Sequence, residues 1–213
     1  DREGVTNSKN MTLNLKATDA VEMYVSGDVS TVFEIENGLK NWTSFKNTLK
    51  IKVTDSDGTK VVKVRFRDDM GNESTEVSDS VILDATPPRG TILINNGEEI
   101  SGELTVTLKL SATDTNGVSS YQLSNDGKTW SEPLAYPKGI PDFEVKGWDL
   151  KQYGGTGDDG LKTVYVRYMD NPGNWSNLIS DNISVDASPP TISVQLVEDK
   201  REAMIPVTVT AII

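Results

Sequence analysis

Carboxylate and amide side chains gather in several turns of this chain, and their oxygen atoms could bind a cation. Calcium prefers about six to eight oxygen ligands from carboxylates, amides and carbonyls. The same residue types also form turns for backbone reasons alone, and none of these turns has the full spacing of an EF-hand loop. The sequence therefore leaves a calcium site and ordinary turn chemistry as alternatives. The candidate calcium ligands are Asp114, Asn116, Asp158, Asp159 and Asp170.

Tryptophan offers a second kind of chemistry, because an exposed indole ring can stack on a sugar ring or pack against a neighbouring domain. Trp175 stands in a Gly-Asn turn, where a large aromatic side chain is expected to be partly exposed. Trp148 and Trp175 both occupy positions without an aromatic counterpart in the earlier half of the chain. These two residues are candidate carbohydrate ligands, and packing is the alternative for both.

The composition excludes several other classes of site. The chain of 213 residues has no Cys and no His, so zinc sites and catalytic triads or dyads that need these residues are excluded. Pairs of carboxylates could still catalyse hydrolysis, but those in this chain lie in polar loops. We therefore expect no enzymatic activity, and no cofactor apart from the calcium considered above.

The charge and the hydropathy limit the partners. The net charge of −11 repels nucleic acid and anionic lipid. No apolar run approaches the roughly 18 residues that cross a bilayer. We therefore expect neither nucleic-acid binding nor membrane insertion.

A repeated phrase indicates the elements that position these residues. The sequence VRFRDDMGNES over 64–74 returns as VRYMDNPGNWS over 166–176. The strand before the first of these turns has Val62, Val64 and Phe66 on one face and charged residues on the other, which is typical of a half-buried β-strand. No long window has a helical period. In the second copy we predict strands near 91–95, 104–113, 118–124, 143–149, 162–169 and 178–186.

Four motifs carry a resemblance to a known family. The strand ending VxVRxxDxxGNxS, the exit LDxTPP, the strand VTLxLxATDxxGV and the turn SxDGxxW together resemble bacterial immunoglobulin-like repeats, which are related in architecture to fibronectin type III. The resemblance implies an all-β fold of tandem immunoglobulin-like antiparallel β-sandwiches. It also implies an extracellular or cell-surface location and a role as a spacer, a stalk, an adhesion module or an accessory domain. The motifs lie at 166–176, 83–88, 106–118 and 124–130.

The repeat divides the chain into three segments. These are a first repeat over 1–86, which lacks the strand that opens the second repeat, a second repeat over 87–188, and the opening strands of a third unit over 189–213. The last segment contains Ile192, Val194 and Leu196, which alternate as that opening strand does. Two explanations remain. Either the chain is part of a longer array, or this segment is donated to the incomplete repeat of a neighbouring copy.

A pair of prolines follows the last strand of each repeat, as Pro87-Pro88 and as Pro189-Pro190. Proline fixes φ and biases the preceding residue toward extended conformations, so a joint of two prolines is short and stiff. We predict that adjacent repeats form a rod, and ordinary strand termination is the alternative explanation.

Together these features predict a non-catalytic extracellular spacer or adhesion stalk built of rigid tandem repeats. Two alternatives come from other classes of protein. One is a filament subunit that assembles head to tail by strand donation from 191–213, and the other is a carbohydrate-binding accessory module. The expected partners are neighbouring repeats or further copies of the chain, and a cell-surface polysaccharide or protein.

Overall fold

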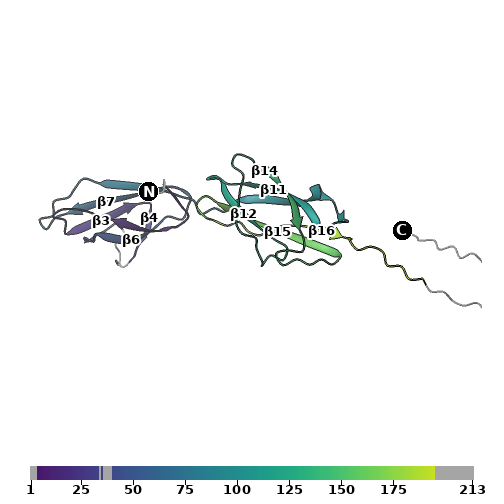
Figure 1. Ribbon diagram of the computed structural model, residues 1–213. Coiled ribbons are helices and arrows are strands. Elements are labelled where there is room, and N and C mark those ends of the chain that lie inside the picture. Colours follow the sequence, from purple (N-terminus) through teal and green to yellow (C-terminus); the bar gives the residue numbers. More distant parts are fainter. Residues whose placement is uncertain (1–3, 34, 36–39, 195–213) are drawn as a thin grey trace, which may run out of the picture.

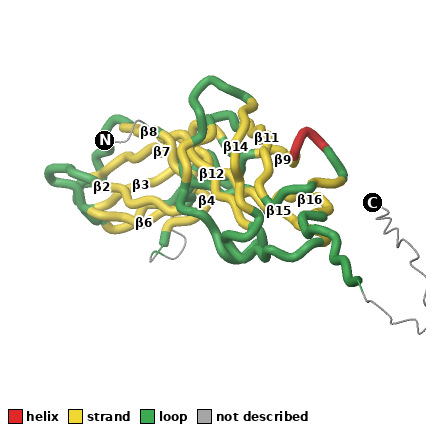
Figure 2. The backbone as a smooth tube through the Cα atoms, turned by 45° about the vertical axis from the view of Figure 1, so that its right-hand side comes forward, coloured by secondary structure: helices red, strands yellow, loops and turns green. Residues whose placement is uncertain are grey.

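The computed structural model describes residues 4–33, 35 and 40–194, and their secondary structure is almost entirely β (Figure 1). The only helical element among these residues is the 3-10 turn η1 (Asn95–Gly97), which is red in Figure 2. The predicted all-β class is therefore confirmed. The predicted strand residue Leu196 lies outside the described residues, as does everything after it.

The strands of the first repeat form two sheets around one core. The five-stranded sheet has the order β1-β8-β7-β3-β5, and the three-stranded sheet has the order β2-β6-β4. Met23 and Val25 from one sheet and Ile51 and Val53 from the other are at most 1% exposed. The strands are β1 (Val5–Thr6), β2 (Asn10–Asn14), β3 (Glu22–Gly27), β4 (Val29–Val32), β5 (Trp42–Ser44), β6 (Thr48–Val53), β7 (Gly58–Arg67) and β8 (Val77–Leu83).

The second repeat has the same plan and a larger core. Its five-stranded sheet has the order β10-β16-β15-β12-β13, and its three-stranded sheet has the order β14-β11-β9. All six strands predicted for this repeat are present, with bounds that differ by at most two residues. The strands are β9 (Arg89–Ile94), β10 (Ile100–Ser101), β11 (Thr105–Thr113), β12 (Val118–Ser124), β13 (Leu134–Ala135), β14 (Asp142–Asp149), β15 (Gly160–Asp170) and β16 (Ile179–Val185).

One carboxylate fixes the repeated turn. After β15, Asp170 Oδ1 accepts hydrogen bonds from the backbone N–H groups of Gly173 at 2.7 Å and Asn174 at 2.6 Å. Gly173 has a φ of 103°, in the left-handed region that favours glycine. In the first repeat Asp68 Oδ1 accepts the N–H of Asn72 at 2.8 Å. The shared residues of this turn are therefore explained by its backbone geometry.

The two repeats differ at one edge of the smaller sheet. In the second repeat β9 pairs antiparallel with β11, and Ile92 and Ile94 of β9 are 7% and 0% exposed. In the described part of the first repeat β2, which is the counterpart of β11, pairs with β6 alone, and no strand takes the place of β9. Within the described residues β2 is therefore an edge strand of its sheet, whereas its counterpart β11 is a central strand.

Candidate cation site at the joint between the repeats

Three carboxylates from both repeats meet where the chain passes from one repeat to the next. Asp84 directly follows β8 of the first repeat, Asp114 follows β11, and Asp170 ends β15. Each offers one carboxylate oxygen, and these three oxygens lie within 4.8 Å of one another. Asp84 is 3% exposed and Asp170 is 0% exposed. Two of the three carboxylates are therefore buried at the joint.

Amide side chains of the second repeat hold the end of the first. Asn116 Nδ2 donates to Asp84 Oδ2 at 2.7 Å, and Asn174 Nδ2 donates to the backbone carbonyl of Asp84 at 2.8 Å. Asp84 Oδ1 accepts the N–H of Thr86 at 3.2 Å within the joint. Asn174 Nδ2 also donates to Asp170 Oδ2 at 2.7 Å. Asp84, at the end of the first repeat, thus accepts hydrogen bonds from two amide side chains of the second repeat.

The surroundings in this cluster raise the pKa of the Asp114 carboxyl group. Burial raises the pKa of its carboxyl, and a hydrogen bond from the backbone N–H of Asn116 lowers it in part. The like charges of Asp84, Asp170 and Asp57 raise the pKa of Asp114 further. Carboxylates at this spacing repel one another, and a divalent cation between them would remove that repulsion. The residues that could hold such a cation are Asp84, Asp114 and Asp170, with oxygen ligands that suit calcium.

The structure brings together some of the predicted ligands and leaves others apart. Asp114, Asn116 and Asp170 meet at the joint, whereas Asp159 lies at the exit of the second repeat. There Asp159 Oδ1 accepts the N–H of Ala187 at 2.8 Å, and a side-chain hydrogen bond from Ser188 lowers the pKa of Asp159. Asp158, beside it, is exposed. These two residues do not belong to the cluster at the joint.

Sequence reasoning missed Asp84, which accepts hydrogen bonds from Asn116 and Asn174 at the joint. The available signal was its place in the repeated exit LDATPP, because VDASPP carries Asp186 at the same position. That repetition identifies Asp84 as part of the exit, but only the packing of the next repeat shows that its carboxylate faces Asn116 and Asp114.

The proline joint is short and partly buried. Pro88 is buried, whereas Pro87, Pro189 and Pro190 are exposed. Two residues after Pro88, Gly90 leaves no room for a side chain, because a Cβ there would lie 2.5 Å from the Tyr168 ring. The chain therefore enters β9 in close contact with the core of the second repeat.

The structure corrects the prediction for Trp148. Its side chain is 8% exposed, its ring stacks on Tyr153 with 5.2 Å between the centroids, and its Nε1 donates to Asn125 Oδ1 at 2.8 Å. Gly147, with a φ of 74°, precedes it at an irregularity in the β11–β14 pairing, and the ring turns into the core. Trp148 is a core residue and offers no surface to a sugar.

Trp175 is half-buried beside a guanidinium group. The Cζ atom of Arg167 lies 4.5 Å from the centroid of the Trp175 ring and 4.5 Å from that of Trp130, so the arginine contacts both rings. Gln122 Oε1 accepts hydrogen bonds from Arg167 Nε at 3.0 Å and Nη2 at 2.7 Å. These contacts give Trp175 a packing role, and carbohydrate binding by its remaining surface stays a prediction.

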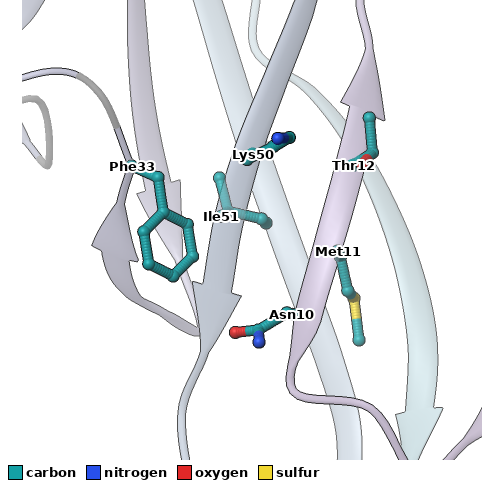
Figure 3. A pocket seen from close by; sticks show the side chains of 6 residues that line it. All are labelled: Asn10, Met11, Thr12, Phe33, Lys50 and Ile51. Carbon is teal, nitrogen blue, oxygen red and sulfur yellow. The ribbon is translucent and has the colours of Figure 1, made fainter.

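A separate pocket lies on the first repeat between β2, β6 and the end of β4 (Figure 3). Its side chains include one cation, Lys50, and the 37% exposed ring of Phe33. None of the predicted site residues lines it, and it has no carboxylate, so we assign it no role. The lining residues are Asn10, Met11, Thr12, Phe33, Lys50 and Ile51.

The solved structures that this chain resembles have fibronectin III-like and immunoglobulin-like domains. One is the fibronectin(III)-like modules of Clostridium thermocellum CbhA, with 15% identity over 90% of this chain and 93% of that one and a TM-score of 0.40. Another is a tetra-tandem repeat from the extending region of a large adhesion protein, with 19% identity, coverage of 86% and 48%, and a TM-score of 0.35. A third is SGBP-B from the mixed-linkage glucan utilization locus of Bacteroides ovatus, in complex with a heptasaccharide, with 16% identity, coverage of 85% and 42%, and a TM-score of 0.26.

Each of these three similarities has an identity below 20% and a TM-score below 0.5. No protein-family model matches the chain. No curated protein matches it either. Within the described ranges, no helix is both long enough and apolar enough to cross a bilayer.

Proposed function

We propose that this chain is a non-catalytic spacer or stalk module of an extracellular or cell-surface protein, and that its repeats act as a stiff rod. The observation that carries the proposal is the binding of Asp84. This residue ends the first repeat, is 3% exposed, and accepts hydrogen bonds from Asn116 and Asn174 of the second repeat. Such contacts oppose bending at the joint, because a bend would leave buried polar groups without partners.

Calcium is a second part of the proposal. Asp84, Asp114 and Asp170 offer three carboxylate oxygens from two repeats at one point. A calcium ion bound there would neutralise their mutual repulsion and connect the repeats directly. The raised pKa of Asp114, caused by burial and by its carboxylate neighbours, supports this part of the proposal.

Single-molecule energy transfer between the repeats tests the rod. The chain has no cysteine, so fluorophores can be attached at Lys46→Cys and Lys146→Cys, which are exposed positions on different repeats. We expect one narrow distance distribution, and we expect Asp84→Ala to broaden it. Asp186→Ala is the matched control, because Asp186 occupies the same position at the exit of the second repeat and is exposed. A broad distribution in the unmodified joint, unchanged by Asp84→Ala, would contradict a stiff joint.

A further inference from the structure

The arginines on the outer faces of the two five-stranded sheets are paired differently in the two repeats. On β7 Arg65 forms an ion pair with Glu73. Arg67, two residues later, forms one with Glu22. On β15 the half-buried Arg167 forms no ion pair with any residue that the structure describes, although the chain has a net charge of −11. A partly buried guanidinium group without a counter-ion is unfavourable, and an anion bound to it would offset that cost.

The missing carboxylate results from one residue of the repeated turn. The first repeat has Glu73 at the position that Trp175 occupies in the second. Glu73 Oε2 accepts a hydrogen bond from Arg65 Nη1 at 2.7 Å. Trp175 contacts Arg167 with its aromatic ring, which has no carboxylate oxygen. The first repeat therefore supplies an anion to its own arginine, and the second repeat does not.

The unused polar groups around Arg167 are all hydrogen-bond donors. A guanidinium group has five N–H groups, and Gln122 Oε1 accepts one from Arg167 Nε and one from Arg167 Nη2. The other N–H groups of Arg167 bind no acceptor in the part of the chain that the structure describes. Within that part, the indole N–H groups of Trp130 and Trp175 also bind no acceptor. A set of donors of this kind suits an anion and does not suit a cation.

Neutral groups hold the guanidinium group in place. Gln122 Nε2 donates to the carbonyl of Ser131 at 2.7 Å, which orients the Gln122 oxygen toward Arg167. Gln122 and Ser131 are 8% and 5% exposed. The ring centroids of Trp130 and Trp175 each lie 4.5 Å from the Cζ atom of the arginine. Because Arg167 is already ordered, it loses little conformational freedom when it binds a ligand.

We infer that Arg167 binds the carboxylate of an acidic sugar of the uronic acid type, with Trp130 and Trp175 beside it. A guanidinium group matches a carboxylate with two parallel N–H···O hydrogen bonds. The indole rings offer apolar surface to the C–H groups of a sugar ring, which an inorganic anion or an acidic side chain lacks. This inference goes beyond the proposed spacer role, because it names a ligand, and it does not depend on the stiffness of the joint.

The charge of the chain limits the size of the ligand. The net charge of −11 repels a long polyanion. At 0.15 M salt that repulsion is screened over about 8 Å, so it acts weakly on a short ligand with few carboxylates. We therefore expect a short acidic oligosaccharide to bind, and we choose trigalacturonate as the probe at this salt concentration.

NMR of the indole N–H groups tests the ligand class. The chain has four tryptophans, and we expect trigalacturonate to shift the indole signals of Trp130 and Trp175 but not those of Trp42 and Trp148. The methyl ester of trigalacturonate has the same sugar rings without the charge. A peptide of three glutamates has carboxylates without the sugar. Each of these two should bind about tenfold more weakly than trigalacturonate, because each lacks one of the two kinds of contact.

Two variants with the same added charge test the site. Trp175→Glu gives Arg167 the partner that Arg65 has in the first repeat, and it should weaken the binding of trigalacturonate about tenfold, read from the Trp130 signal. The matched control is Leu161→Glu, at a position that is 71% exposed and about 20 Å away along the same strand. This control should bind as the unmodified chain does.

Four outcomes would overturn the inference. The first is that the unmodified chain shows no shift with trigalacturonate at several millimolar. The second is that the methyl ester binds as well as the acid, which would remove the carboxylate from the interaction. The third is that the glutamate peptide binds as well, which would identify the partner as an acidic peptide. The fourth is that the two glutamate variants bind alike.

Discussion

The two repeats share a turn but use the residue that follows it in different ways. In the first repeat Arg65 Nη1 donates to Glu73 Oε2 at 2.7 Å. In the second repeat Arg167 stands at the position of Arg65, and it contacts the ring of Trp175, which replaces Glu73. The same position thus forms an ion pair in the first repeat and a cation–π contact in the second. The comparison shows that the turn fixes the fold, while this surface position can change its chemistry.

A second difference lies in the core. Tyr168 is 0% exposed, and its hydroxyl donates to the carbonyl of Thr91 on β9 at 2.6 Å. Its counterpart, Phe66, is half-buried and has no hydroxyl. The tyrosine therefore occurs in the repeat that has a β9 carbonyl to receive its hydrogen bond.

The largest expected effect is a difference between the two cores in the cost of truncating a leucine. Leu110→Ala should lower the free energy of unfolding of the second repeat by about 3 kcal/mol or more, because Leu110 is 0% exposed and truncation leaves a cavity. Leu15→Ala should cost about 1 kcal/mol, since Leu15, the counterpart of Leu110 in the first repeat, is only half-buried. Urea unfolding followed by peptide-resolved hydrogen exchange measures each repeat separately. Equal losses would show that the first core is as well packed as the second.

The next effect concerns the turn. Asp170→Ala should destabilise the second repeat by about 2 kcal/mol, because the buried Asp170 carboxylate accepts two part-buried N–H groups that then lose their acceptor. Asp68→Ala should cost about 1 kcal/mol, because the same turn is exposed in the first repeat. The same unfolding measurement applies to both variants. A larger loss for Asp68→Ala would mean that burial does not set the strength of this turn.

Calcium should stabilise the chain by binding at the joint, and it should not bind at the corresponding turn of the first repeat. A calcium concentration ten times the dissociation constant should stabilise the chain by about 1.4 kcal/mol, seen as a rise in the melting temperature that a chelator reverses. Asp114→Asn should abolish the rise. Asp19→Asn, at the counterpart position, should preserve it. No rise in the unmodified chain would remove calcium from the proposed function.

The acid dependence of Asp114 adds a test that needs no metal. Its pKa is raised on folding, so the folded chain binds more protons than the unfolded chain between the two pKa values. The free energy of unfolding should therefore fall as pH rises through that window and then level off. Asp114→Asn should flatten this part of the pH profile in calcium-free buffer, measured by urea unfolding. A profile that keeps its slope would assign the effect to other carboxylates.

The smallest expected effect comes from giving the second repeat the ion pair that the first repeat has at this surface position. Trp175→Glu should let Arg167 form the ion pair that Arg65 forms with Glu73, and the change in stability should be within about 1 kcal/mol. Added salt should weaken the variant more than the unmodified chain, because an exposed ion pair is screened. Thermal unfolding at low and high salt measures this. A loss well above 1 kcal/mol would make Trp175 part of the core.

Much of the fold could be predicted from local patterns. Alternation gave the strands of the second repeat, and the left-handed conformation of Gly173 follows from the turn in which it lies. Asp114 and Asp170 could be identified as candidate ligands because short polar residues in turns carry free oxygens. These features depend on a few neighbouring residues, and sequence contains that information.

Two features could not be predicted, because they depend on packing. Trp148 lies in a strand where Phe143 and Val145 alternate regularly, and only the irregular pairing near Gly147 turns its ring inward. Asp84 belongs to the cluster because the next repeat docks against it. Local alternation contains no information on either event.

The role of Asp84 gives the chain a polarity. The exit of each repeat has an aspartate, and the entry has an aspartate turn with an amide, as in Asp170 with Asn174 or Asp68 with Asn72. If the exits of two copies met, Asp186 of one would face Asp186 of the other. If two entries met, Asp68 of one copy would face Asp68 of the other. In the described joint, exit meets entry, and the Asp84 carboxylate accepts a hydrogen bond from the amide of Asn116. The joint therefore has a direction, because a carboxylate and a carbonyl lie on one side of it and amide donors lie on the other.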